Sequence, residues 1–551
     1  MPSHARTLRR KESTARSQAR PHATTLGTSR ISCPGIELPG GLNATGLNRL
    51  DERVRIKFTS REANLRRLDR TRFPLLNPHM MNSLLDQLSR RAFLGRQACG
   101  IGGLALATML AEDAPRARAS DAAAAILPRV RAKRVLCLFQ HGGPSQVDLF
   151  DPKPALQKYH GMPYPGGDLE VHFDKQKGNV LGSPYKFVKQ GQCGMELSEL
   201  LPHLGSIADD VTLIRSMTTE SVDHEAALRL IHTGRFLAGM PVWGSWVLYA
   251  LGSINRDIPA YVVLGDPGGL PVDGEKNWSS AWLPAAYQGV PLRSGRSPVL
   301  NLVPPDGRGG DMAARRRQLD FLQVLNRQHL ERHPENTELS ARIENFELAA
   351  RMQTAVKSIL DISQETKATQ EMYGLNRDES REYGTRCLIA RRLLEGGARF
   401  VQLYMAGQPW DTHSKNAETL KGLCARTDQP CAALVKDLKQ RGLLDDTIIL
   451  WGGEFGRQPI SQGPDGRDHN RHAFSMWIAG GGFKRGYVHG STDEFGYKSV
   501  EKVVNVHDLH ATLLECLGLD HRRLTLPHDG RDASLTDAEV TKARPVPELL
   551  A

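Results

Sequence analysis

Carboxylates and imidazoles gather in three short segments of this 551-residue chain, and their types suit metal binding. The candidate ligands are Asp411, His413, Glu454, His469 and His472. Hard carboxylate oxygens and borderline imidazole nitrogens suit a divalent cation such as zinc or manganese, with calcium as an alternative. Glu454 is flanked by glycines, which let a backbone approach a ligand closely. The residue types therefore predict a divalent-metal site.

The same residues also have ordinary structural interpretations. Asp411 can cap a following helix, and the histidines can be hydrogen-bonded loop residues. Arg457 is expected to pair with a carboxylate rather than with a substrate. His141 follows the first predicted strand and competes with His469 and His472 for the place of a third metal ligand. The sequence leaves this choice open.

Apolar runs adjoin these segments and must position them. Runs with the pattern of buried strands occur at 134–139, 211–214, 260–264, 400–404, 447–451 and 475–479. Helical patterns at 381–394 and 429–441 lie between the later runs and end at glycines. This alternation predicts an α/β fold with a mostly parallel sheet and helices on both faces. Ligands of such sheets bind at the carboxyl ends of the strands, so we expect the segments to share one rim.

The domain is expected to cover residues 120–551, a length that suits one large α/β domain. A polar stretch at about 312–370 is rich in Arg, Glu and Gln and has a helical pattern. We interpret it as a helical insertion into the sheet domain.

An export signal is predicted upstream of this domain. Arg90 and Arg91 precede an apolar run at 101–110, which is too short for a stable membrane span, and 117–119 has a small-x-small cleavage pattern. This layout is typical of a twin-arginine signal peptide at 80–119. We expect the twin-arginine export machinery to deliver the protein to the periplasm or the extracellular space, with no membrane span after signal removal. Residues 1–79 are interpreted as an unstructured or mis-started extension.

Charge argues against nucleic-acid binding. Residues 1–119 hold 21 Lys and Arg against 9 Asp and Glu, whereas residues 120–551 hold 51 and 52. The net charge of +11 therefore belongs to the leader. No basic surplus remains in the predicted domain to neutralise phosphates, so nucleic acid is not expected as a partner.

Six cysteines follow the predicted cleavage point, and their spacing is not that of a metal site. Cys137 and Cys387 lie in apolar surroundings and are predicted to be buried thiols. A disulfide between Cys424 and Cys431 is allowed after export.

The order of the motifs resembles a known family. The motifs are QHGGPSQVD at 140–148, HEAALRLIHTGR at 224–235, WDTH at 410–413, WGGEFGR at 451–457, DHNRH at 468–472 and VHDLHATLL at 506–514. Together they resemble the sulfatase-like domain of unknown function 1501 family, within the alkaline-phosphatase superfamily. The resemblance covers about 130–530 and implies an alkaline-phosphatase or sulfatase-like fold.

The resemblance also implies roles for individual residues. Asp411 and His413 match an Asp-and-His metal pair, and Glu454 stands where these enzymes place an aspartate. His469 or His472 matches the last histidine that contacts metal or oxyanion.

Three positions depart from the pattern of sulfatases. Phe455 replaces the second member of a metal pair, and Gln140 and His141 replace the first-strand aspartates. The nucleophilic Cys or Ser of sulfatases stands nine residues before Thr-Gly-Arg, a position that is His224 here. A formylglycine mechanism is therefore excluded.

Two functions of different class follow. The first is an exported metal-dependent hydrolase of sulfate or phosphate esters, on an anionic small molecule or polysaccharide, with metal-bound water or His224 as nucleophile. Arg457 or Arg235 would steady the anionic substrate, and His141 is a further catalytic candidate. The second is a non-catalytic protein that binds anionic glycans or exported partners.

Overall fold

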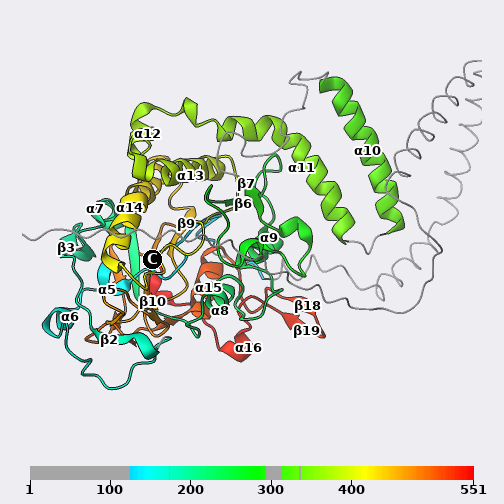
Figure 1. The fold of residues 1–551 in the computed structure, drawn as a ribbon. Helices are drawn as coiled ribbons and strands as arrows, with labels where there is room; N and C mark the ends of the chain where they lie inside the picture. Colours follow the sequence, from blue (N-terminus) through cyan, green and yellow to red (C-terminus); the bar gives the residue numbers. More distant parts are fainter. Residues whose placement is uncertain (1–124, 128–129, 173, 293–311, 334–336) are drawn as a thin grey trace, which may run out of the picture. The chain divides into compact units, whose positions relative to one another are not determined.

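The computed structural model describes residues 125–127, 130–172, 174–292, 312–333 and 337–551 (Figure 1). The predicted extension at 1–79 and the predicted signal peptide at 80–119 lie outside the described residues. Within the described part of the chain, no helix has the length and apolar character needed to cross a membrane.

A nine-stranded sheet forms the centre of the domain, in the order β14-β5-β13-β9-β1-β8-β6-β7, with β17 paired to β5. The strands are β1 (Arg134–Phe139), β5 (Val211–Thr218), β6 (Tyr261–Leu264), β7 (Val290–Leu292), β8 (Phe400–Leu403), β9 (Thr447–Gly452), β13 (Phe474–Ala479), β14 (Tyr487–His489) and β17 (Val504–Asn505). β13 runs antiparallel to both β5 and β9, and the other pairings in this sheet are parallel. The predicted mostly parallel sheet is therefore confirmed.

Helices cover both faces of the sheet. The α-helices of the described residues are α5 (Gln146–Leu149), α6 (Pro154–Lys158), α7 (Pro202–Gly205), α8 (His224–Thr233), α9 (Trp243–Leu251), α10 (Met312–Arg332), α11 (Thr337–Leu360), α12 (Lys367–Met372), α13 (Asp378–Glu395), α14 (Asn416–Gln440), α15 (Val506–Cys516) and α16 (Ala538–Thr541). On one face, α13 and α14 pack against alternate strand residues such as Leu136 and Leu403. On the other, α8, α9 and α15 pack against the intervening residues, such as Val135 and Phe400. The strand runs are continuously apolar because both of their faces are buried.

Short antiparallel pairs join segments around the sheet. They are β2 (Lys177–Val180) with β11 (Ile460–Gln462), β3 (Phe187–Gln190) with β4 (Met195–Ser198), β10 (Gly456–Arg457) with β12 (His469–Asn470), β15 (Ser491–Thr492) with β16 (Ser499–Glu501), and β18 (Leu526–His528) with β19 (Arg531–Ala533). Of these, β10–β12 links the segment after β9 to the segment before β13. It therefore joins two of the predicted site segments.

The start of α14 differs from the prediction. The helix begins at Asn416 rather than at 429, and Pro430 lies inside it. Proline is common in the first turn of a helix, so the sequence pattern suggested a start beside Pro430. The buried face continues across the proline, with Leu420 and Leu423 before it and Leu434 after it, which explains the longer helix.

The six cysteines of the described residues are free thiols, so the allowed Cys424–Cys431 disulfide does not form. Both residues lie in α14, where seven residues rise by about 10 Å. A disulfide needs Cα atoms less than about 7 Å apart. Cys137 and Cys387 are buried, as predicted.

Candidate metal centre

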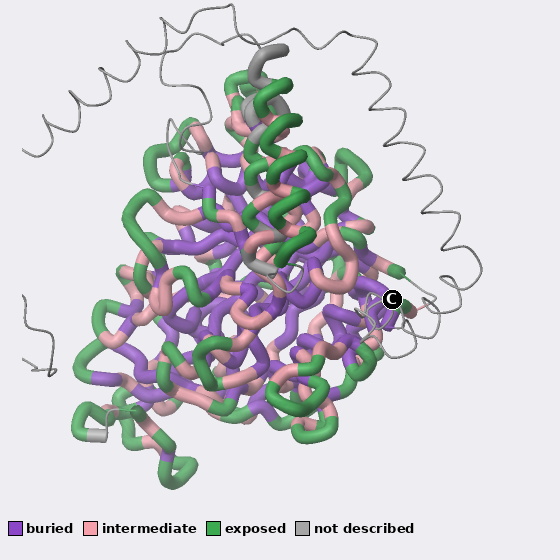
Figure 2. Tube along the Cα trace, turned by 90° about the vertical axis from the view of Figure 1, so that its right-hand side faces the viewer, coloured by how far each residue is buried: buried purple, intermediate pink, exposed green. Residues whose placement is uncertain are grey.

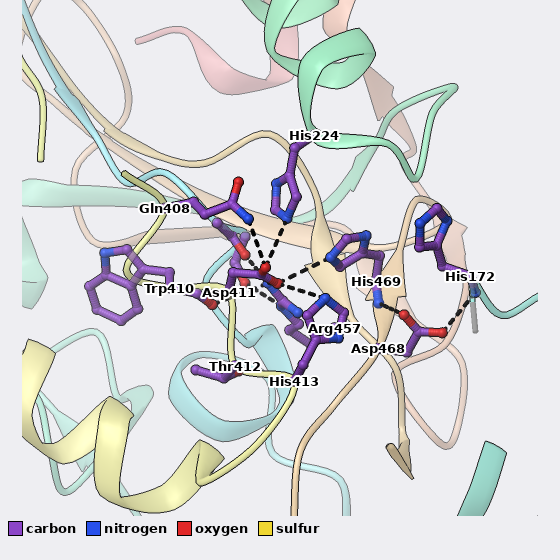
Figure 3. A network of polar contacts seen from close by, with 12 residues as sticks. His172, His224, Gln408, Trp410, Asp411, Thr412, His413, Arg457, Asp468 and His469 are labelled. Atoms are coloured by element: carbon purple, nitrogen blue, oxygen red, sulfur yellow. Dashed lines mark hydrogen bonds and ion pairs between the residues drawn. The ribbon is translucent and has the colours of Figure 1, made fainter. Parts of the chain in front are cut away.

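Four side chains meet at the carboxyl-end rim of the sheet: His224, Asp411, His413 and His469. The ligand atoms that they offer all lie within 4.8 Å of one another. Asp411 and His413 follow β8, His469 lies in β12, and His224 is the first residue of α8. Figure 3 shows the three imidazoles around the Asp411 carboxylate. The cluster could hold a metal ion.

Local backbone structure fixes two of these residues. The Asp223 side chain caps α8 by accepting a hydrogen bond from the Ala226 N–H (3.0 Å), which sets His224 in the first helical turn. In the β10–β12 pair, Arg457 stands opposite His469. These two side chains therefore approach Asp411 from the same pair of short strands.

Each imidazole has its Nδ1 atom beside an oxygen acceptor. His224 Nδ1 lies 2.6 Å from Glu454 Oε1, and His469 Nδ1 lies 2.6 Å from the carbonyl oxygen of Val222. His413 Nδ1 contacts the side-chain oxygen of Gln462. Because these oxygens only accept hydrogen bonds, each Nδ1 carries the ring proton.

The three Nε2 atoms consequently point at one carboxylate. They lie 3.4 Å (His224), 3.0 Å (His413) and 3.1 Å (His469) from the Asp411 oxygens. An Nε2 lone pair facing a carboxylate is favourable only if the ring is protonated or a cation lies between them. A hydrogen bond from Nδ1 to an outer oxygen is the usual arrangement of metal-binding histidines.

Asp411 is held by two further donors. Arg457 Nη2 lies 2.7 Å from Asp411 Oδ1, and Gln408 Nε2 donates to Asp411 Oδ2 (2.9 Å). Arg457 is fully buried, and its guanidinium also donates to backbone carbonyls, including those of Gly142 and Gly143. Arg457 therefore pairs with a carboxylate, and its donors are used inside the protein.

Charges within the cluster shift its pKa values strongly. Burial would raise the pKa of Asp411, but its hydrogen bonds to the three histidines and the charge of Arg457 hold it far below its usual range. Burial would lower the pKa of His224, but the carboxylates of Asp411 and Glu454 raise it to about 9. Burial lowers the pKa of His469 to about 4, against the opposing hydrogen bond to Asp411. Without a cation, the cluster thus binds a proton on His224.

Glycine is required where two backbone segments touch at this site. Gly142 has φ +108°, and a Cβ there would lie 2.4 Å from the Asp411 backbone nitrogen. A Cβ on Gly466 would lie only 1.8 Å from the His413 carbonyl oxygen. These close approaches set Asp411 and His413 against the neighbouring loops.

Glu454, predicted as a metal ligand, lies directly behind His224. It is completely buried, and Oε1 also accepts a hydrogen bond from the Gly142 N–H (2.9 Å). Its Oε2 atom has no hydrogen-bond partner among the described residues. The structure thus places Glu454 outside the four-residue cluster, as the partner of one of its members.

The remaining predicted site residues are not members of the four-residue cluster. His472 Nε2 contacts Glu170 (2.8 Å), and Arg235 Nη2 contacts Asp537 (2.8 Å). His141 is buried. The centroid of its ring lies 4.8 Å from that of Phe139 and 5.3 Å from that of Tyr404. Burial and the nearby histidines lower the pKa of His141 well below its usual value.

Two further rings border the site: Phe455, which the sequence places at a metal-pair position without a ligand atom, and His172, which the sequence does not indicate. Phe455 lies 4.7 Å from the His224 ring and 4.5 Å from the His469 ring, and it forms an apolar wall. His172 is exposed and stacks on His469 at 5.2 Å. The Asp468 side chain anchors His172 by accepting from its backbone N–H (2.7 Å) (Figure 3). No spacing signal links 172 to 469, so only the folded chain reveals this neighbour.

Residues 132–550 match a family described as Protein of unknown function (DUF1501). The match covers well over half of the chain. This chain belongs to the DUF1501 family. The four-residue cluster and its outer partners lie within the family region, whereas the predicted leader precedes it.

Several solved structures share limited similarity with this DUF1501 chain. The PsFucS1 sulfatase from Pseudoalteromonas sp. is 13% identical, with 75% of this chain and 73% of that chain covered and a TM-score of 0.31. The phosphonate monoester hydrolase SpPMH from Silicibacter pomeroyi is 11% identical (75% and 78% covered, TM-score 0.30). A protein in the alkaline phosphatase superfamily from Vibrio parahaemolyticus is 11% identical (72% and 70% covered, TM-score 0.32). No curated protein matches by sequence. At these scores the neighbours carry no inference about activity.

Proposed function

We propose that this DUF1501 protein is a metal-dependent hydrolase of sulfate or phosphate esters that acts outside the cytoplasm. One observation carries the proposal: three imidazoles, each with its Nδ1 atom bound to an oxygen, direct their Nε2 atoms at Asp411. Three nitrogen donors and one carboxylate form a ligand set that fits a divalent ion such as zinc or manganese.

The donor types favour zinc or manganese over calcium. Calcium takes six to eight oxygen ligands, whereas imidazole nitrogens suit zinc and other transition metals. His224, Asp411, His413 and His469 would hold the ion. A bound ion of this kind polarises an ester oxygen and lowers the pKa of a water molecule toward neutrality.

The residues around these four orient them. Glu454 and Gln462 fix the ring tautomers of His224 and His413, and Arg457 keeps Asp411 ionised and turned toward the histidines. His224 has both ring nitrogens engaged, by Glu454 and by Asp411. This arrangement favours water over His224 as the nucleophile.

The substrate is proposed to be an anionic ester, and a sulfated or phosphorylated glycan is the preferred class. Neither predicted arginine is placed to contact it, because Arg457 is fully buried and Arg235 pairs with Asp537. His172 is the exposed polar ring beside the cluster and would contact the substrate. Export by the twin-arginine route would deliver the folded protein to extracellular glycans.

One observation supports a non-catalytic alternative. The position at which sulfatases carry their Cys or Ser nucleophile is His224, and its ring is held between two carboxylates. A protein with this site would bind anionic glycans or exported partners without cleaving an ester.

The first test of the proposal is the metal content of the purified protein. We expect about one zinc or manganese ion per purified chain, lost in Asp411→Ala while the circular dichroism spectrum is unchanged. The metal-loaded protein is then tested on p-nitrophenyl sulfate, p-nitrophenyl phosphate and sulfated polysaccharides. A folded protein without metal would overturn the proposal, and metal binding without ester cleavage would favour the non-catalytic alternative.

A further inference from the structure

Helix α10 has one face against the rest of the domain and one face in solvent. Leu319, Gln323, Asn326 and Leu330 recur at helical spacing and are partly buried. This face points to α11, where Gln323 Nε2 donates to Glu347 Oε1 (2.6 Å). In Figure 1, α10 projects beyond the sheet and is flanked by α11. The opposite face of α10 is therefore turned away from the rest of the described domain.

The open face carries a cluster of large apolar side chains at the middle of the helix. Phe321 is 63% exposed, Leu322 50%, Val324 51% and Leu325 45%. Figure 2 shows the exposed character of this helix. Scattered apolar residues on a surface are ordinary, but four within five positions of one helix indicate a contact surface. We call Phe321, Leu322, Val324 and Leu325 the α10 patch.

Charged residues of alternating sign follow one flank of the patch. Their order along the helix is Arg316, Asp320, Arg327 and Glu331, and all four are exposed. At 100° per residue they fall within one narrow band of the helix surface. Arg316 Nε lies 3.0 Å from Asp320 Oδ1, a pair exposed enough to exchange partners at little cost.

This pattern is complementary to itself when one copy of the helix is reversed. A two-fold axis between Gln323 and Val324 brings Asp320 opposite Arg327 of a second copy. It also brings Arg316 opposite Glu331 of the second copy. In a parallel two-fold pair this flank would face the opposite flank of the second copy, so the four charges would not meet their complements. The charge order thus selects a second, antiparallel copy of this chain as the occupant.

We propose that two copies of this protein associate through antiparallel pairing of their α10 helices, with the two α10 patches in contact across a two-fold axis. In this arrangement, Leu322 of one copy lies opposite Leu325 of the other. A contact of this kind is isologous, because the same patch serves both copies, and it closes at a dimer.

The area available suits a dimer of moderate affinity. The exposed fractions of the four patch residues correspond to about 400 Å² of apolar surface on each copy, roughly half of what a stable interface buries per partner. The charged flank, along a helix of 21 residues, supplies the polar rim of the interface.

Charge reversal tests the pairing on the full-length protein. Asp320→Arg places two arginines opposite each other across the interface, and Arg327→Asp places two aspartates together. Each single variant is expected to shift the dimer toward monomer. Sedimentation velocity should give a dissociation constant at least tenfold larger than that of the wild type. An equimolar mixture of the two variants restores opposite charges at both contacts and is expected to restore the dimer. Both residues are exposed, so folding should be unaffected.

A second variant tests the apolar part. Leu325→Asp is expected to give monomer, whereas Val540→Asp, at an exposed apolar residue of α16, is expected to leave the dimer intact. A wild-type protein that stays monomeric up to about 100 µM would overturn the proposal. A dimer that the charge variants do not weaken, or a mixture no better than its components, would also overturn it.

Discussion

Glu454 Oε1 lies 2.6 Å from His224 Nδ1, although 230 residues separate them in the chain. The same oxygen accepts the Gly142 N–H, so one buried carboxylate connects the loop after β1, the loop after β9 and the start of α8. Because Nδ1 is occupied, the Nε2 atom of His224 is the one that faces Asp411. Glu454 would therefore influence a bound metal through His224 and not as a ligand.

This arrangement predicts graded losses of metal affinity. Glu454→Gln retains an acceptor for His224 but loses the charge, and we expect about tenfold weaker binding of zinc. Glu454→Ala leaves the ring unsupported and should approach a hundredfold loss. Chelator competition measures both constants.

The matched control is Glu170→Gln, because Glu170 pairs with His472 and Arg471 outside the cluster. Its zinc affinity should equal that of the wild type. If Glu454→Ala instead abolishes binding as completely as Asp411→Ala, Glu454 is itself a ligand.

A glycine pair tests the position of His413. A Cβ at Gly466 would meet the His413 carbonyl oxygen at 1.8 Å, so Gly466→Ala must displace the His413 backbone and should remove most metal binding. Gly463→Ala lies three residues away, with φ +59° and no atom within 4 Å of its Cβ. It should cost about 1 kcal/mol in stability from backbone strain while leaving metal binding intact. Equal metal content in the two variants would contradict the role of this close approach.

The sheet was predictable because its strands carry a strong signal. Runs such as 134–139 and 447–451 are apolar at every position but the first, and burial of both faces demands that pattern. The start of α14 was not predictable, because Pro430 is a start signal that long-range packing overrides.

In the candidate site, too, the local sequence predicts some features and only long-range packing decides others. Asp411, His413 and His469 stand beside strands and were nominated as ligands from residue type and position, and the structure brings them together. Whether a residue is a metal ligand or lies behind one depends on small differences in tertiary packing. The sequence therefore could not show that His224 lies in the cluster and Glu454 lies behind it. His172 reaches His469 from a distant loop, and no local pattern encodes that contact.

A buried arginine is expected to dominate the stability of the helical layer. Arg391 of α13 contacts Glu365 (2.6 Å), Glu395 (2.6 Å) and Asp437 of α14 (2.9 Å). Arg391→Ala removes this partner from Glu365 and Asp437, which are nearly buried; Glu365 keeps Arg392, and Asp437 keeps Arg441 (2.7 Å). The expected loss in unfolding free energy is about 2–3 kcal/mol.

Lys133→Ala is the control for this arginine. It removes an exposed ion pair with Asp446 and should cost less than about 1 kcal/mol. Urea unfolding followed by circular dichroism compares the two variants. Similar losses would show that the Arg391 network contributes no more than a surface pair.

Two buried histidines are expected to destabilise the protein in acid. Burial lowers the pKa of His232 and that of His510 to about 3. His510 Nε2 donates to the Ile231 carbonyl (2.9 Å), and His232 Nε2 contacts the Tyr404 hydroxyl (3.2 Å). Between pH 3 and an unfolded pKa of about 6.5, the unfolded chain holds more protons than the folded one. The stability is therefore complete above pH 6.5 and is lost as the pH falls toward 3.

Removing one of these imidazoles should make the unfolding free energy depend less steeply on pH. Each contributes a slope of up to about 1.4 kcal/mol per pH unit in this window, so His510→Gln should reduce the slope of unfolding free energy against pH by that amount. Glutamine can still donate to Ile231, which limits other effects of the substitution. Urea unfolding at pH values from 4 to 8 measures the slopes, and the two proteins should run parallel above pH 7. Parallel profiles between pH 4 and 6 as well would mean that His510 takes up its proton in the folded protein as readily as in the unfolded chain.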